Sequence, residues 1–214
     1  GPTAKMYGLD CARKSSSGAC RERSCLFPSL CPALKPDHRP QLNLLRRLRS
    51  LSGVKHVFVA SGIRPDIVSA DKSCGDEYMS AIARHHVSGQ LKLAPEHVVG
   101  HVLECMGKPS VKSLLEFKRK FDAASQKCAK KQFLTYYFIA AHPGCSEADM
   151  RELKVFAERS LNLRPEQVQI FTPTPMTAAT CMYYTGIDPF TGKNVYVARG
   201  LGEKQRQKDV LMKR

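Results

Sequence analysis

Polar side chains follow four apolar or β-branched runs of this sequence, in each case beside a proline or a glycine. The four stretches are SGIR at 61–64, PEH at 95–97, HPGC at 142–145 and TPTP at 172–175. If the runs are parallel strands, their carboxyl ends share one face, which is where α/β proteins bind ligands. A carboxylate, a guanidinium, imidazoles and hydroxyls would then meet in one site. Its predicted residues are Ser61, Arg64, Glu96, His97, His142 and Thr174.

Each of these residues also fits an ordinary structural role. Glu96 would suit a helix N-terminus, where the macrodipole favours negative charge. His97 would suit a cap, and Arg64 would suit a structural ion pair. Proline and glycine are themselves common turn residues. We favour a shared site because all four stretches combine a turn residue with a polar group.

Four cysteines near the start of the chain form a second candidate site, with the spacing Cys-x8-Cys-x4-Cys-x5-Cys. Four thiolates suit a tetrahedral zinc ion or an iron–sulfur cluster. Asp37 and His38 follow closely and would suit an outer shell around the metal. A set of reduced loop thiols is the alternative. The predicted metal ligands are Cys11, Cys20, Cys25 and Cys31.

Strand and helix patterns alternate beyond residue 40 and supply the elements that would position these groups. The predicted strands begin about 35 to 40 residues apart, a spacing that suits βα units with parallel strands. Four such units make an open α/β sheet or half of a barrel, because a closed (β/α)8 barrel needs eight. The predicted strands are 54–61, 89–94, 131–141 and 166–171, and NVYVA at 194–198 is a further candidate. The predicted helices are 41–51, 76–86, 97–106, 110–128 and the segment from the Ser146–Asp149 capping box to Leu161, with a charged helix at the end.

Composition sets the remaining expectations for this chain of 214 residues. Its net charge of +15 indicates a polyanionic partner, above all nucleic acid, or alternatively a solvated basic face. No run approaches the ~18 apolar residues of a membrane span, so no membrane partner is expected. Nine cysteines, an odd number, argue against a secreted disulfide scaffold, and we expect a cytoplasmic protein. We predict a Cys-rich loop segment at 1–40, βα units at 41–190 and a C-terminal tail with a helix at 191–214.

Several motifs resemble those of a known family. FIAAHPGCSEADM and IFTPTPMTAAT resemble the fifth- and sixth-strand elements of radical S-adenosylmethionine (SAM) enzymes of the MiaB-like group, and GQLKLAPEHVVGHVLECMGKP resembles their fourth unit. GPTAxMYG, CLFPSLCPxLxxDH, HHVSGQLKLAPEH and MYYTGxDPFT resemble the YgiQ type of radical SAM protein along nearly the whole chain.

The resemblance implies an α/β fold that is a partial (β/α)6 barrel, of which this chain supplies about the last four βα units. It implies a [4Fe-4S] cluster, SAM and a 5′-deoxyadenosyl radical, acting on an unknown substrate for which RNA or another polyanion is a candidate. The family's Cys-x3-Cys-x2-Cys motif is absent from this sequence. We therefore expect the chain to begin just after the second barrel strand and to be inactive alone. The rival interpretation is a non-catalytic, basic nucleic-acid-binding module with a structural zinc loop.

The resemblance also implies particular SAM contacts. Ser61 and Arg64 match positions near the methionine moiety, and Glu96 matches one that meets the ribose or the carboxylate. His142 and Cys145 depart from the family's fifth-strand pattern. Some radical SAM enzymes carry an auxiliary iron–sulfur cluster, and the resemblance favours such a cluster over zinc at Cys11, Cys20, Cys25 and Cys31. The other residues implied to bind SAM are Gly1, Pro2 and Thr3 at the amine, and Pro143, Gly144 and the backbone around Thr174 at the adenine.

Overall fold

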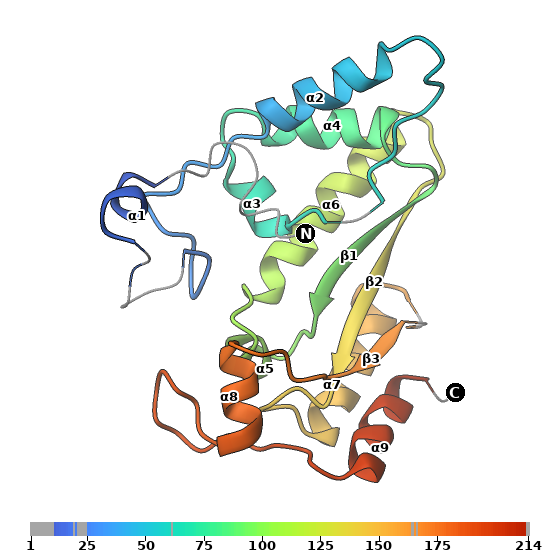
Figure 1. Cartoon of the computed structure of the whole chain (residues 1–214). Helices are drawn as coiled ribbons and strands as arrows, with labels where there is room; N and C mark the ends of the chain where they lie inside the picture. Colours follow the sequence, from blue (N-terminus) through green and yellow to red (C-terminus); the bar gives the residue numbers. More distant parts are fainter. Residues whose placement is uncertain are drawn as a thin grey trace. The chain divides into compact units, whose positions relative to one another are not determined.

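The structure is a computed structural model in which an α/β fold contains a parallel sheet of three strands in the order β1–β2–β3 (Figure 1). In the sheet, β2 runs parallel to β3 with Phe138 opposite Val168. The strands are β1 (Gln90–Glu96), β2 (Phe133–Ala140) and β3 (Val168–Ile170). The residues that the structure describes are 11–18, 20, 25–60, 62–163, 165 and 167–212.

Nine helices accompany the sheet within the described residues. Their starts follow local sequence: proline stands in the first turn of α2 and of α3, where a missing N–H costs nothing. The capping box predicted at Ser146 and Asp149 is confirmed at the start of α7. The helices are α1 (Ala12–Ser17), α2 (Arg39–Arg49), α3 (Pro65–Ala70), α4 (Gly75–His85), α5 (Gly100–Cys105), α6 (Val111–Lys127), α7 (Glu147–Ser160), α8 (Ala178–Thr185) and α9 (Leu201–Met212).

The chain divides into two compact units. The first unit comprises residues 1–93 and 112–135, and the second comprises residues 94–111 and 136–214. In the first, α2 and α3 pack on α4, and its buried core includes Tyr78, Ile82, Phe117 and Phe121. In the second, α9 packs on α7 and on β3, and its buried core includes Phe138, Met150, Leu153 and Met182.

Three of the four predicted strands are confirmed, but the segment predicted as the first strand is not a strand. The described part of it, residues 54–60, runs beside α4 and β1 with two backbone hydrogen bonds, Val59 N–H to the His86 carbonyl and Lys92 N–H to the Ala60 carbonyl. Its β-branched composition favoured a strand, yet Phe58 is 49% exposed. A half-exposed segment with so few ladder bonds does not complete a strand pair.

The structure corrects two further points and leaves others as predictions. NVYVA forms only an isolated antiparallel bridge, between Ile187 and Asn194. The short helices α1, α3 and α8, of six to eight residues, were not predicted, because so few turns give no clear apolar period. No helix in the described parts of the chain is long and apolar enough to cross a membrane. The boundaries at residues 40 and 190 stay predictions.

Candidate functional site at the strand ends of the second unit

Glu96 is the last residue of β1 and has a strained backbone. Its φ is +67°, a left-handed value that residues other than glycine rarely adopt. Its carboxylate lies 3.0 Å from the Lys108 ammonium, which also donates to the Ala94 carbonyl at 3.4 Å. The Glu96 side chain is 23% exposed. The structure therefore holds a partly accessible carboxylate at the carboxyl end of this strand, in a conformation typical of functional sites.

His142 follows the end of the neighbouring strand β2 and is buried. Its Nδ1 lies 2.8 Å from the Pro143 carbonyl, which can only accept, so Nδ1 carries the proton and Nε2 keeps its lone pair. Burial lowers the pKa of His142, while this hydrogen bond and the negative charge of Glu96 oppose the shift. A neutral imidazole thus stands within electrostatic reach of the Glu96 carboxylate. Ala141, directly before it, also has a left-handed φ of +59°.

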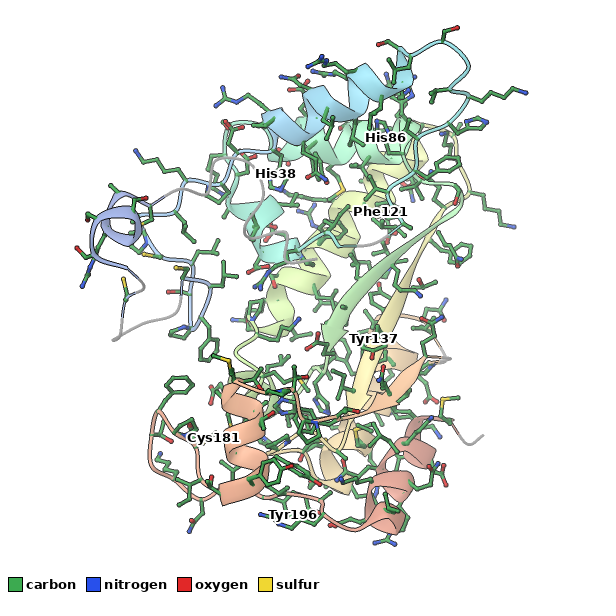
Figure 2. All side chains as sticks on the ribbon, in the orientation of Figure 1. His38, His86, Phe121, Tyr137, Cys181 and Tyr196 are labelled. Atoms are coloured by element: carbon green, nitrogen blue, oxygen red, sulfur yellow. The ribbon has the colours of Figure 1, made fainter. Side chains whose placement is uncertain are left out.

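Tyr137 brings a hydroxyl from the same strand. Its O–H bonds with the Gln169 side chain on β3, and its position on β2 is labelled in Figure 2. Burial raises the pKa of Tyr137, and the charge of Glu96 adds to this effect. A carboxylate and an imidazole therefore lie at the carboxyl ends of β1 and β2, and a neutral phenol lies within β2 in electrostatic reach of Glu96.

A row of aromatic rings extends from the strand ends to α8 and α9. The His142 ring meets the edge of Phe171 with centroids 4.9 Å apart, and Phe171 lies 5.9 Å from Tyr183. The Lys204 ammonium donates to the Tyr183 hydroxyl at 2.7 Å and lies 4.7 Å from the ring centroid. Arg199 lies on the same ring at 5.9 Å. Cation–π contacts of this kind stabilise the Tyr183 ring, and the Phe171 ring contacts both Tyr183 and His142.

Gly144 forms the turn after His142 and Pro143, and its N–H donates to the Tyr196 carbonyl at 2.8 Å. A Cβ at this position would lie 2.8 Å from the Cys105 sulfur, and its φ is +87°. Both features demand glycine at this position.

Gln207 of α9 fixes the same turn from the other side. Its side-chain oxygen accepts the Ala141 N–H at 2.9 Å, and its amide donates to the Cys145 carbonyl at 2.8 Å. Gln207 is 1% exposed. One buried amide thereby satisfies two backbone groups of the loop that carries His142.

His97 and Cys145 form a buried pair beneath this turn. The Val99 N–H donates to Nδ1 of His97 at 3.1 Å, so the ring proton lies on Nε2, which is 3.6 Å from the Cys145 sulfur. The thiol in turn donates to the Ser146 carbonyl at 3.6 Å. Burial lowers the pKa of His97 to about 4 and raises that of Cys145 to about 12. The pair is therefore neutral and shapes the turn, whereas an activated nucleophile needs a thiolate.

The remaining predicted residues are distributed differently. Arg64 belongs to the first unit, where its guanidinium pairs with Asp66 at 2.6 Å, as in the ion-pair alternative. Thr174 is exposed in the second unit, and its carbonyl accepts the hydroxyls of Thr177 and Thr180 at the start of α8. Gly1, Pro2, Thr3 and Ser61 lie outside the described residues.

The predicted metal ligands are described, although several residues between them are not. Cys31 N–H donates to the Cys25 carbonyl at 2.9 Å. In the described segments of the chain, no three His, Cys, Asp or Glu side chains are grouped so as to hold a metal ion. Of the two expected outer-shell residues, Asp37 pairs with Arg39 and His38 pairs with Asp71. The metal at Cys11, Cys20, Cys25 and Cys31 stays a prediction.

Comparison with known proteins gives strong similarity along the whole chain. A UPF0313 protein of Fusobacterium nucleatum is 49% identical over 211 residues, which are 99% of this chain and 37% of that protein. UPF0313 proteins of Methanosarcina mazei and Thermotoga petrophila are 46% and 43% identical, over 99% and 100% of this chain and 33% and 37% of their own lengths. The chain is similar to UPF0313 proteins. It spans about a third of the length of these relatives. Residues 166–214 match a family described as "Domain of unknown function (DUF3362)".

Sequence reasoning did not find Gln207 or the partner of His97. Gln207 lies in a charged helix without a usable apolar period, so nothing in the sequence marks it as buried. The separation of His97 from Cys145 by 48 residues likewise gives no local signal. The sequence did indicate polar residues near the ends of β1 and β2: Glu96 is the last residue of β1, and the turn with His142, Pro143 and Gly144 follows β2.

Proposed function

We propose that this chain is part of a radical SAM iron–sulfur enzyme of the YgiQ type, in which the strand ends of the second unit contact SAM. The observation that carries the proposal is the convergence of Glu96 and His142 from neighbouring strands, each at a left-handed backbone turn. Backbone strain of this kind clusters at ligand sites. The motif resemblance at these same two turns adds independent support.

The residues present suit the polar half of SAM. The Glu96 carboxylate can accept hydrogen bonds from ribose hydroxyls or pair with the amine in place of Lys108. Nε2 of His142 is an acceptor, and the neighbouring Phe171 ring offers an apolar face. SAM would supply the 5′-deoxyadenosyl group. As part of the same proposal, the three-stranded sheet of this chain belongs to a partial (β/α)6 barrel in the longer protein.

The [4Fe-4S] cluster of the family does not fit the residues of this chain, because no Cys-x3-Cys-x2-Cys motif is present in it. No catalytic step is therefore derived through the cluster here. As part of the same proposal, Cys11, Cys20, Cys25 and Cys31 hold an auxiliary iron–sulfur cluster or zinc in the longer protein. All nine cysteines are free thiols. As part of the same proposal, the protein is cytoplasmic.

The test uses an anaerobically purified protein that spans the full length of the relatives. Calorimetric titration with SAM compares wild type with Glu96→Gln, which keeps the shape of the side chain and removes its charge. A charged hydrogen bond contributes about 1.5–3 kcal/mol, so we expect affinity to fall about ten- to a hundredfold at unchanged iron content. Glu104→Gln, an exposed carboxylate on α5 of the same unit, is the matched control.

Two outcomes would contradict this proposal in different ways. Equal SAM affinities for wild type and Glu96→Gln would remove Glu96 from the site and leave the enzyme class standing. A protein free of iron and acid-labile sulfide would refute the enzyme class itself. Zinc in place of iron, bound through the segment from Cys11 to Cys31, would support the rival, a non-catalytic basic module with a structural zinc loop.

A further inference from the structure

Three helices of the first unit end close together, at the upper right of Figure 1. His86, labelled in Figure 2, marks the end of α4. The Lys130 ammonium, just after α6, donates to the Arg84 carbonyl in the last turn of α4. Gln132 donates to the carbonyls of Ala83 and Val87, which ties the same segment to α4 a second time. The carboxyl ends of α4 and α6 are therefore joined directly.

The end of α2 reaches the same place. Burial lowers the pKa of His85, and the positive charges of Arg49, Arg84 and Lys130 lower it further. Arg49 is the last residue of α2. Cations at the ends of α2, α4 and α6 therefore all lie within electrostatic reach of the His85 imidazole.

Three stretches of sequence supply this surface, residues 47–60, 83–90 and 126–135, and none of them contains Asp or Glu. Their cations at the helix ends are all exposed. Among the described residues, these cations form no ion pair with a carboxylate. We name them the basic end: Arg47, Arg49, Lys55, Arg84, Lys127, Lys130 and Lys131.

Helix capping accounts for only part of this charge. Each helix C-terminus carries roughly half a negative charge, so three of them offset about 1.5 of the positive charges. The basic end has seven cations, and most of that charge is left without compensation. Self-repulsion of such a cluster destabilises the folded chain unless an anion binds to it.

An exposed aromatic stack adjoins the basic end. The rings of His56 and Phe58 are stacked with centroids 5.3 Å apart and 10° between their planes. The segment is anchored to α4, because His86 Nδ1 bonds to the Val57 carbonyl at 2.8 Å and Val59 N–H donates to the His86 carbonyl at 2.8 Å. A fixed, half-exposed aromatic beside cations is what unpaired bases stack on, since every base has a π-face.

We propose that the basic end binds single-stranded nucleic acid, with phosphates on its cations and a base stacked on Phe58. Duplexes offer only phosphates to such a surface, because their bases are already stacked and paired. This binding does not depend on the proposed SAM site, since all of its residues belong to the first unit.

The experiment measures fluorescence anisotropy of a labelled oligouridine of about 12 nucleotides, a length that spans one binding face. The 214-residue chain is titrated between about 50 and 200 mM salt. For Lys127→Gln/Lys131→Gln we expect weaker binding and a log–log salt slope shallower by about 1.4, since each phosphate contact on a single strand contributes about 0.7. Lys72→Gln/Lys112→Gln, exposed lysines of the same unit away from this end, removes equal charge as the control.

Phe58→Ala tests the stacking contact separately. It should lower affinity roughly 5- to 150-fold and leave the salt slope unchanged. Phe190→Ala, an 81% exposed aromatic of the second unit, should leave both unchanged. Titration with a DNA oligonucleotide of matching sequence shows whether the ribose 2′-hydroxyl contributes to binding. The proposal is supported whether the RNA or the DNA strand binds more tightly.

Several results would overturn it. Equal effects of the two lysine double variants would mean that only net charge matters. Full affinity in Phe58→Ala, or stronger binding of a duplex than of the single strand, would exclude base stacking. Binding to phosphatidylserine vesicles without binding to either oligonucleotide would identify the surface as a membrane contact instead.

Discussion

The Nε2 atom of His97 lies 3.6 Å from the sulfur of Cys145, and both groups are neutral. The distance resembles that of a cysteine–histidine catalytic pair, in which the thiol is ionised and the imidazole is protonated. Here the hydrogen bonds indicate a protonated thiol and a neutral imidazole. Nδ1 accepts from the backbone, so Nε2 donates to sulfur, and the thiol donates to the Ser146 carbonyl. An imidazolium–thiolate pair would require a partly exposed, electropositive site.

The first prediction concerns the reactivity of Cys145. Burial raises its pKa to about 12, so almost no thiolate exists near neutral pH. Native alkylation with iodoacetamide, followed by peptide mass spectrometry, should modify the exposed Cys25 and Cys181 and leave Cys145 intact until the chain is unfolded. Modification of Cys145 as fast as Cys181 would show that the pair is activated after all.

The second prediction concerns pH dependence. The pKa of His97 falls from 6.5 to about 4, because burial and the charges of His101 and His142 outweigh the attraction of Asp149. As the pH falls, His97 therefore becomes protonated at about pH 6.5 in the unfolded chain but only at about pH 4 in the folded chain. Stability from this group is complete above that window and is lost as pH falls through it, by about 2 kcal/mol between about pH 7 and pH 5.

Urea unfolding of wild type and His97→Gln at the two pH values measures this contribution. The variant should be less stable near pH 7 and should lose less stability on acidification. His56→Gln, at an exposed histidine of the first unit, is the control and should keep the wild-type pH dependence. Parallel pH profiles for wild type and His97→Gln would mean that His97 already titrates normally in the folded chain.

The third prediction concerns Asp71, which joins the start of α2 to that of α4. It accepts hydrogen bonds from His38, Ser73 and Cys74, and these outweigh the effect of burial and lower its pKa to about 2. Asp71→Asn replaces one acceptor by a donor in this buried network. We expect it to reduce the free energy of unfolding by about 3 kcal/mol near neutral pH.

The control for Asp71 is Asp76→Asn, in which an 87% exposed carboxylate loses its ion pair with Lys120. Exposed pairs contribute about 0–1 kcal/mol, so its effect should be small. The Asp71 contribution is present above about pH 4 and is lost as pH falls toward about 2. Similar losses for both variants in urea unfolding would contradict the special role of Asp71.

The fourth prediction concerns Gln207. Gln207→Ala leaves the Ala141 N–H and the Cys145 carbonyl buried without partners, which should cost about 2–4 kcal/mol. Gln205→Ala, on the exposed side of the same helix, should cost at most about 0.5 kcal/mol. Hydrogen exchange should locate the loss at residues 141–145; uniform loss over the second unit would point to helix packing instead.

The sequence allowed prediction of the elements with strong local patterns. β1, β2, α4, α6 and α7 follow directly from apolar period and capping chemistry. The strand prediction for residues 54–60 was wrong. Their β-branched composition indicates only a preference for strand conformation, whereas a strand also needs a partner strand along its whole length. The polar residues Glu96 and His142 at the ends of two strands could be recognised from the sequence, whereas their joint role as a site stays a prediction. Contacts between segments far apart in the sequence, such as those of Gln207 and Cys145, could not be predicted, because no local pattern marks them.

The chain passes between the two compact units at residues 93–94, 111–112 and 135–136. Two of these crossings fall inside β1 and β2, so single continuous strands belong to both units. Neither unit can therefore be encoded as one uninterrupted stretch of gene. A deletion, a fusion junction or a recombination breakpoint between residues 93 and 136 separates segments of the same unit, so no single junction can exchange either unit intact.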